Sequence, residues 1–423
     1  MGQNDIAWEK LFDKYNIFNE IEKHGKFIIS AKQIKEFREP RLMTKFDHKI
    51  NLPKIFYENK LAILPITRGD YIISSFNAYK EFDVQNDDFQ RITIPSHIQS
   101  LIPKFIISET IALNCANACG ILNDFLEDEE IIPTVSGRMS SGSFNFNIDV
   151  LNGTKKIQVK NSQIEIDAAY EGINYLSLIE AKRDLAEDFL VRQLYYPFRV
   201  WNDRVTKKVK NIFMIFSNGM FNLYEYEFTD PLNYNSLYLV KQKNYLIATE
   251  IYLTDIEDIL NSVDIVKEPD ISFPQADCMS RIINLIELLN EKFMTKQDIT
   301  SEYAFDKRQT NYYTDAGRYL GFIDKSYDEN GNVLFKLSAL GHHIMGLEYR
   351  ERQLTIVKQI LQHKVFNETL KLHLKTYEMP SKEKIVQIMK ESNLYHVEAD
   401  STYFRRASTV VGWINWIFEI IDV

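Results

Sequence analysis

The sequence predicts an α+β protein built from several domains. The chain has 423 residues, whereas a single hydrophobic core stops growing at roughly 250–300 residues. Strand-like segments dominate residues 85–268, and helical segments dominate after Pro269 and Pro274. Strands followed by runs of helices are typical of α+β folds or of separate domains. We therefore expect four regions, at residues 1–84, 85–268, 269–345 and 346–423.

Composition narrows the class of protein. Hydrophobic residues make up 45% and charged residues 26% of the chain, as in globular rather than disordered proteins. No apolar run approaches the ~20 residues of a membrane span, and the N-terminus lacks the apolar core of a secretory signal. The three cysteines form no framework, which favours a reducing cytosol. We expect a cytoplasmic protein with no membrane partner.

The net charge of −9 argues against a protein that coats nucleic acid through bulk charge. Its distribution is uneven, however. Ten basic and four acidic residues lie between Lys23 and Lys60, whereas twelve acidic and six basic residues lie between Glu127 and Asp188. A basic segment suits phosphate binding, and an acidic one concentrates cations. A charged surface without such a role would give the same numbers.

The first region is expected to open with a short helix that carries Trp8 and Leu11 on one face, followed by strand-like pieces at 61–65 and 71–76. The second region is expected to begin with one long helix at about 108–126. Cys115 and Cys119 would share a face of this helix and serve in packing, because no further Cys or His lies nearby at zinc-site spacing.

A series of strands follows, which one helix at about 184–201 interrupts. Residues 137–142 are expected to form a plain turn between elements. The strands are expected at 144–150, 156–160, 163–167, 175–182, 212–217, 221–228 and 237–240.

The third region contains three expected helices, at 275–293, 295–304 and 306–320. Two strand-like pieces follow, and Asp328-Glu-Asn-Gly-Asn332 between them is a strong hairpin signal. Three helices followed by a β-hairpin is the winged-helix order. The last region has a similar helical layout, with helices expected at about 348–363, 366–375, 380–392 and 400–420.

The segment from Gln163 to Lys182 carries the most informative pattern. Side chains alternate between the two faces of a strand, so Glu165 and Asp167 share one face, and Glu180 and Lys182 share a face of the next strand. The residues Gly172-Ile-Asn between them can turn the chain. Antiparallel pairing of these strands would bring Asp167 close to Glu180.

Two clustered carboxylates repel each other unless a positive charge lies between them. Mg²⁺ is bound through one or two carboxylates together with substrate phosphates, and a nearby lysine can act on the attacking water and offset developing charge. Asp167, Glu180 and Lys182 therefore predict a metal-dependent phosphodiesterase centre. The alternative is a set of surface salt bridges.

A second set of residues has similar spacing, namely Asp47 with Glu58-Asn-Lys60. Pro53 interrupts that region, and no amphipathic helix follows it. In contrast, the helix expected from Asp184 onward would follow Lys182 directly. We therefore favour the site at 180–182 over the site at 58–60.

These residues resemble the motif of the PD-(D/E)xK nuclease superfamily, and more particularly bacterial type II restriction endonucleases with fused helical DNA-reading domains. The matching residues are Asp167, then Glu180-Ala-Lys182, then the helix that bears Gln193. The resemblance covers about 95 residues, from 108 to 201. The sequence departs from the pattern at Ile166, where many members have proline, and at Pro197, where the RecB-type variant has tyrosine.

The resemblance implies a mixed central sheet flanked by helices, joined to mainly helical winged-helix domains. It implies hydrolysis of both strands of a specific DNA sequence, with Mg²⁺ that Mn²⁺ can replace. Asp167, Glu180 and the carbonyl group of Ala181 would hold the metal. Glu109 on the preceding helix is the matching further carboxylate, and Glu165 is its competitor. A cognate DNA methyltransferase and a homodimer on DNA are further implications.

Candidate DNA-binding residues lie in three segments. Arginine, glutamine and asparagine are the side chains that bond base edges in the major groove, and arginine and lysine bind phosphates. Ordinary salt bridges with Glu39, Asp47 and Asp70, or packing between helices, are the alternatives. The candidates are Arg38, Arg41, Lys45 and Arg68 in the first region, Arg308, Gln309 and Asn311 on the helix at 306–320, and Arg405 and Arg406 on the last helix.

Two rival functions remain open at this point. One is a repair or recombination nuclease that recognises DNA structure rather than sequence. The other is a winged-helix regulator with an inactive nuclease-like fold, although the complete Asp, Glu and Lys set argues against it. A motor driven by nucleotide hydrolysis is disfavoured, because the chain has no Walker-type glycine-rich loop.

Overall fold

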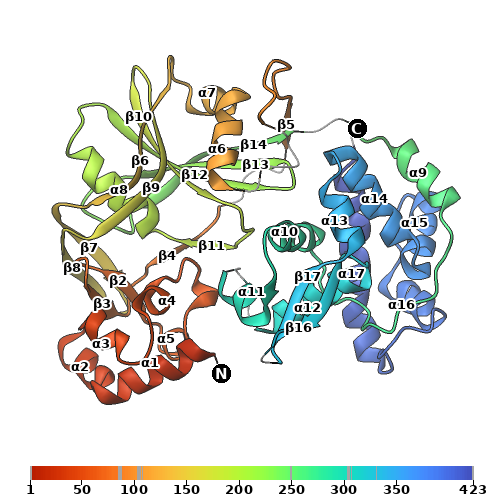
Figure 1. The fold of residues 1–423 in the computed structure, drawn as a ribbon, viewed down its shortest axis with the longest axis horizontal. Helices are drawn as coiled ribbons and strands as arrows, with labels where there is room; N and C mark the ends of the chain where they lie inside the picture. Colours follow the sequence, from red (N-terminus) through yellow and green to blue (C-terminus); the bar gives the residue numbers. More distant parts are fainter. Residues whose placement is uncertain are drawn as a thin grey trace. The chain divides into compact units, whose positions relative to one another are not determined.

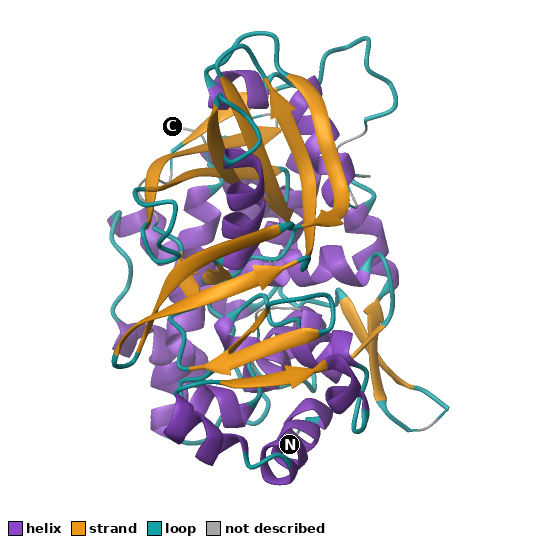
Figure 2. Ribbon diagram, turned by 90° about the vertical axis from the view of Figure 1, so that its left-hand side faces the viewer, coloured by secondary structure: helices purple, strands orange, loops and turns teal. Residues whose placement is uncertain are grey.

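The computed structural model describes residues 2–83, 88–101, 106, 108–247, 250–302, 305, 307–329 and 331–421. The chain packs as two compact units. The first unit comprises Met1–Gln90, Ser108–Phe216 and Met220–Tyr245, and the second comprises Arg91–Ile107, Ser217–Gly219 and Leu246–Val423. The first unit holds a seven-stranded sheet and the second is mainly helical, so the α+β class is confirmed (Figures 1 and 2).

The first unit opens with a small α+β module, residues 2–74, drawn in red in Figure 1. Its three-stranded antiparallel sheet has the order β1-β3-β2. Trp8, Phe12 and Phe56 pack edge to face within its own apolar core. Its elements are α1 (Gln3–Lys14), α2 (Ile17–His24), β1 (Phe27–Ser30), α3 (Ala31–Lys35), α4 (Pro40–Thr44), the 3-10 helix η1 (Lys49–Asn51), α5 (Lys54–Glu58), β2 (Ala62–Pro65) and β3 (Asp70–Ser74).

The seven-stranded sheet of the first unit has the order β5-β14-β13-β12-β10-β9-β6. It is mixed, because β10 pairs with β12 in parallel and with β9 antiparallel. Its strands are β5 (Phe89–Ile92), β6 (Ile132–Ser140), β9 (Gln163–Glu171), β10 (Tyr175–Lys182), β12 (Lys208–Ser217), β13 (Met220–Phe228) and β14 (Leu237–Ile247).

Other elements of the first unit surround this sheet. The helices are α6 (Glu109–Ala118), α7 (Ile121–Leu126) and α8 (Arg192–Asn202), and the strands β7 (Ser143–Val150) and β8 (Gly153–Lys160) form a separate hairpin. The short strand β4 (Tyr79–Glu81) pairs with β11 (Asp188–Leu190). Tyr195 and Phe198 of α8 pack against Phe228 of β13 in a core rich in aromatic rings.

Three sequence-based expectations for this unit are wrong. The helix expected at 108–126 is broken, because Gly120 adopts a left-handed conformation (φ 75°) between α6 and α7. Residues 137–142 are not a plain turn, since most of them belong to β6, whose register shifts near Gly137. The helix expected from Asp184 begins only at Arg192, after a loop and β11. The pairing of Cys115 and Cys119 on one helix face is confirmed, with their Sγ atoms 3.9 Å apart.

The second unit contains helices and one small antiparallel sheet of order β15-β17-β16. The side-chain N–H of buried Trp413 donates to the Ala276 carbonyl group and joins its last helix to the segment before its second helix. Its elements are α9 (Leu253–Ser262), α10 (Met279–Leu289), β15 (Met294–Thr295), α11 (Lys296–Glu302), α12 (Lys307–Tyr319), β16 (Ile323–Tyr327), β17 (Val333–Leu337), α13 (Ala339–Met345), α14 (Tyr349–Leu361), α15 (Lys364–Thr376), α16 (Lys382–Lys390) and α17 (Asp400–Glu419).

The expected hairpin is confirmed, since β16 and β17 pair in register from Tyr327 with Val333. Asn330 of the expected turn, and residues 303, 304 and 306 of the expected helices, lie outside the described residues. Over the part of the chain that is described, no helix is long and apolar enough to cross a membrane.

Candidate active site

Strands β9 and β10 bring the predicted residues together. They pair antiparallel, with Ala168 opposite Ile179, which confirms the predicted hairpin. Just beyond this pair, the backbone N–H of Ala181 donates to Oδ2 of Asp167 at 2.8 Å. Because directly opposed residues of antiparallel strands point to the same side of a sheet, Asp167 lies on the face that Glu180 and Lys182 share.

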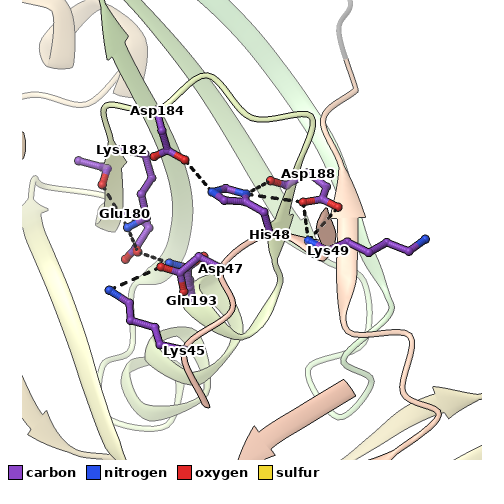
Figure 3. Close-up of polar contacts among 10 residues, drawn as sticks. Lys45, Asp47, His48, Lys49, Glu180, Lys182, Asp184, Asp188 and Gln193 are labelled. Carbon is purple, nitrogen blue, oxygen red and sulfur yellow. Dashed lines mark hydrogen bonds and ion pairs between the residues drawn. The ribbon is translucent and has the colours of Figure 1, made fainter. Parts of the chain in front are cut away.

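Glu180 and Lys182 form a buried ion pair at the end of β10. The side-chain Nζ of Lys182 lies 2.6 Å from Oε1 of Glu180 and 3.3 Å from the Ala181 carbonyl oxygen. Gln193, at the start of α8, donates to the same Oε1 at 2.8 Å. Figure 3 shows these contacts, in which the oxygen of Glu180 lies between a cation and an amide.

Burial decides the charge of this pair. Desolvation, against the opposing charge of Lys182 and with the help of the charge of Asp167, raises the pKa of Glu180 to about 7. Burial alone would lower the pKa of Lys182, but the carboxylates of Glu180, Asp167 and Glu109 outweigh it and raise that pKa well above its ordinary value. The side chain of Lys182 is therefore protonated and positively charged, with several acids around it.

Glu109 stands at the first turn of α6, where Oγ of Ser108 caps the helix by accepting from the Ile111 N–H. Burial raises the pKa of Glu109, Lys182 lowers it and Asp167 raises it, so its charge acts on the predicted site. Glu165 forms an exposed ion pair with Arg138, in which Nε of Arg138 lies 3.1 Å from Oε1 of Glu165. The electrostatic coupling of Glu109 to Lys182 and Asp167 favours Glu109 over Glu165, and the role of either acid stays a prediction.

His48, which no sequence pattern marks, ties the N-terminal module to the loop after β10. As a cation, His48 donates from Nε2 to Oδ2 of Asp184 at 2.7 Å and from Nδ1 to the Asp188 carbonyl oxygen at 2.6 Å. Burial opposes its charge, but the hydrogen bonds to Asp184 and Asp188 prevail and raise the pKa of His48 to about 10. These contacts explain why Asp184 begins a loop and not the expected helix (Figure 3).

Asp47 was assigned to the rival site with Glu58 and Lys60, and the structure places it elsewhere. Its charge acts on Glu180 and Lys182. Its Oδ2 lies 3.5 Å from Nζ of Lys45, while its Oδ1 is buried and accepts no hydrogen bond from any described residue. Glu58 is an exposed member of an ion pair with Lys54 on α5. The sequence shows each of these acids, but it does not show that the Asp47 carbonyl group accepts from the N–H of Leu190, more than a hundred residues away.

The oxygen atoms at this site are suitable ligands for a hard cation such as Mg²⁺. Mg²⁺ prefers oxygen ligands, and the oxygens here come from Asp167, Glu180, Glu109 and Asp47. Oε1 of Gln193 is a second buried acceptor that lacks a hydrogen bond within the described part of the chain. Across the described residues no three His, Cys, Asp or Glu side chains converge as ligands. Lys182 and the Ala181 N–H bond to carboxylate oxygens of Glu180 and Asp167. Unpaired buried acceptors nevertheless fit a cation.

The predicted DNA-binding residues are mostly accessible. Arg41, Lys45, Arg68, Arg308, Asn311 and Arg405 are exposed, and Arg38, Gln309 and Arg406 are half-buried. Arg38 donates to Oδ1 of Asn4 at 2.8 Å, and Lys45 makes the ion pair with Asp47 that was the alternative to DNA contact. Nε and Nη1 of Arg406 are buried and have no hydrogen-bond partner among the residues described. DNA contact by this set stays a prediction.

Three family models match successive parts of the chain. Residues 5–73 match "Domain of unknown function (DUF6996)", residues 74–246 match "Domain of unknown function (DUF6997)" and residues 281–422 match "Domain of unknown function (DUF7226)". The first boundary falls at Ser74, the last residue of β3. No curated protein and no solved structure matches the chain. The function of each unit therefore has to follow from its own residues.

Proposed function

We propose that the protein is a type II restriction endonuclease, which hydrolyses phosphodiester bonds in a specific double-stranded DNA sequence with Mg²⁺. The observation that carries this proposal is the β9–β10 hairpin, which gathers Asp167, Glu180 and Lys182 into one buried polar cluster. The mixed sheet around it is consistent with a PD-(D/E)xK nuclease core. A cognate methyltransferase, a homodimer on DNA and a bacterial cytoplasm belong to the same proposal.

Asp167, Glu180, the Ala181 carbonyl group and Glu109 would hold the metal, and Mn²⁺ would substitute for Mg²⁺. When bound, the ion supplies Lewis-acid polarisation of the phosphate and lowers the pKa of water. Gln193 fixes Glu180 by donating to Oε1, so that the carboxylate faces the site in one orientation. The Ala181 N–H does the same for Asp167. Such fixed ligands need little reorganisation when the substrate arrives.

Lys182 acts as a donor and as a positive charge. Its raised pKa keeps it protonated in the resting protein, so it does not take a proton from water as a base. It would instead donate a hydrogen bond that orients the attacking water and would offset the charge that grows on the phosphate. The hydrogen bond that it now gives to Glu180 would be exchanged for one to water or phosphate.

The second unit would read the DNA sequence. Its order of α10, α11 and α12 followed by the β16–β17 hairpin is the order of a winged helix. Arg308 and Asn311 are exposed on α12, and Arg405 is exposed on α17, where they can reach base edges or phosphates. Arg38, Arg41, Lys45 and Arg68 of the N-terminal module would add phosphate contacts.

The test is incubation of the full-length protein with unmethylated phage DNA and Mg²⁺, followed by sequencing of the fragment ends. We expect discrete fragments with one shared end sequence. Asp167→Ala, Glu180→Ala and Lys182→Ala should each abolish cleavage while DNA binding survives, and Glu58→Gln is the control variant with an exposed acid removed. Full cleavage by any of the three site variants would overturn the assignment. A smear or flap-specific cuts would indicate a structure-specific nuclease instead.

A further inference from the structure

We propose that Asp47, contributed by the N-terminal module, is a further metal-holding carboxylate of the site on β9 and β10. The inference rests on the proposed function and extends it. It makes the module of residues 2–74 a structural part of the active site, in addition to a region that contacts DNA. The other acids all come from residues 109–180, so Asp47 joins them from a distant part of the sequence.

The first observation is the unsatisfied oxygen of Asp47. Its Oδ1 is buried and has no hydrogen-bond partner among the described residues. A buried polar group without a partner is destabilising, and more so when it is charged. The charge of Asp47 also acts on both members of the Glu180–Lys182 pair. Asp47 therefore has a buried oxygen that can bind a cation.

The second observation is the way in which the backbone around Asp47 is fixed. Four consecutive residues, from Phe46 to Lys49, each bond to a residue beyond the module. The Phe46 carbonyl group accepts from Oη of Tyr79 at 2.9 Å, and the Asp47 carbonyl group accepts from the Leu190 N–H at 2.9 Å. A stretch tied at every residue cannot move its carboxylate far from the site.

His48 and Lys49 complete this attachment. His48 donates to Asp184 at 2.7 Å and to the Asp188 carbonyl group at 2.6 Å, and the Lys49 N–H donates to Oδ1 of Asp188 at 3.1 Å. Asp184 follows Lys182 by two residues. The same loop therefore leaves the catalytic strand and holds the segment that presents Asp47 (Figure 3).

Lys45 does not satisfy Asp47. Its Nζ lies 3.5 Å from Oδ2, the other carboxylate oxygen, and its side chain is 61% exposed. Exposed ion pairs of this kind contribute little to stability. Oδ1 thus stays free for a ligand while Oδ2 keeps a weak solvent-exposed partner.

The experiment measures Mn²⁺ binding by isothermal titration calorimetry on the full chain without DNA. Asp47→Asn keeps the shape of the side chain and removes its charge. We expect Mn²⁺ to bind this variant at least tenfold more weakly than the natural protein, with an unchanged or higher melting temperature in the absence of metal. Asp167→Asn is the positive control, and Glu58→Gln, in the same module, should bind Mn²⁺ like the natural protein.

Each outcome decides the matter. If Asp47→Asn binds Mn²⁺ as tightly as the natural protein while Asp167→Asn binds it weakly, Asp47 is not a ligand and the proposed function stands. If the natural protein binds no Mn²⁺ and does not cut DNA, both ideas fail together. Asp47→Ser repeats the measurement with a small side chain, and unfolding of both Asp47 variants without metal would show a structural role and overturn the proposal.

Discussion

The ammonium group of Lys182 lies among acids that would otherwise repel one another. Its Nζ is 2.6 Å from Glu180, and the charges of Asp167, Glu109 and Asp47 also act on it. At the residue scale, this single cation offsets part of the negative charge of the acids around it. The remaining negative charge favours a further cation at the proposed metal site.

Replacing Lys182 by methionine should destabilise the metal-free protein. Removing one partner of a buried ion pair leaves an uncompensated charge and typically costs about 3–5 kcal/mol. Because Mn²⁺ can supply the missing positive charge, added Mn²⁺ should recover much of this loss. Chemical unfolding with and without Mn²⁺ measures the effect. Equal stability of the variant and the natural protein without metal would contradict it.

The pH dependence of folding should report on His48. Its pKa is about 10 in the folded protein and about 6.5 in an unfolded chain. A raised folded pKa contributes stability that is fully present below pH 6.5 and is lost as pH rises toward 10. His48→Gln should therefore be less stable than the natural protein by a few kcal/mol at pH 6, with a smaller gap at pH 9.5. Urea unfolding of both proteins at the two pH values tests this, and a constant gap would refute it.

At the element scale, the strands were the easiest part to predict. The segment 175–182 is mostly apolar, and it forms β10 with the predicted bounds. The expected helix start at Asp184 failed for a non-local reason, because Asp184 and Asp188, which are spaced like residues of one helix face, both bind His48. The strand β6 was missed because Gly137 and its serine neighbours have turn propensity, which pairing with β9 overrides.

The break between α6 and α7 gives a prediction at the same scale. Gly120 has φ 75° and open space around its Cα, so Gly120→Ala meets no clash and carries only the strain of its backbone. We expect a loss of about 1 kcal/mol or somewhat more. Gly69→Ala is the matched control, since that glycine also has open space but no positive φ. Equilibrium unfolding should separate the two variants, and equal effects would count against the strain.

At the scale of the whole molecule, the sequence indicated the local cluster of the candidate site better than the long-range contacts around it. Asp167, Glu180 and Lys182 are close in sequence and could be placed by strand alternation. Asp47 and His48 act over more than a hundred residues, and no local pattern marks such a contact. The sequence-based division at residue 84 also gave no sign that the first two regions pack in one compact unit.

DNA binding by the whole molecule should depend on exposed cations of the second unit. Arg308→Ala and Arg405→Ala together should weaken binding at low salt and reduce the slope of affinity against salt concentration by about one to two. Mn²⁺ binding without DNA should not change. Binding titrations at several salt concentrations measure the slope, with Glu58→Gln as a control. An unchanged slope would remove these two residues from the DNA interface.

The contact between His48 and Asp188 also has a consequence during synthesis of the chain. It closes a loop of 140 residues, and such long-range contacts form only after their entropy cost is met. A nascent chain that has not yet reached residue 184 lacks Asp184, Asp188 and Leu190, three of the partners that hold the segment around Asp47. Under the proposed function, a growing chain cannot cut the DNA of the cell that makes it, and cutting begins only when the central sheet is complete.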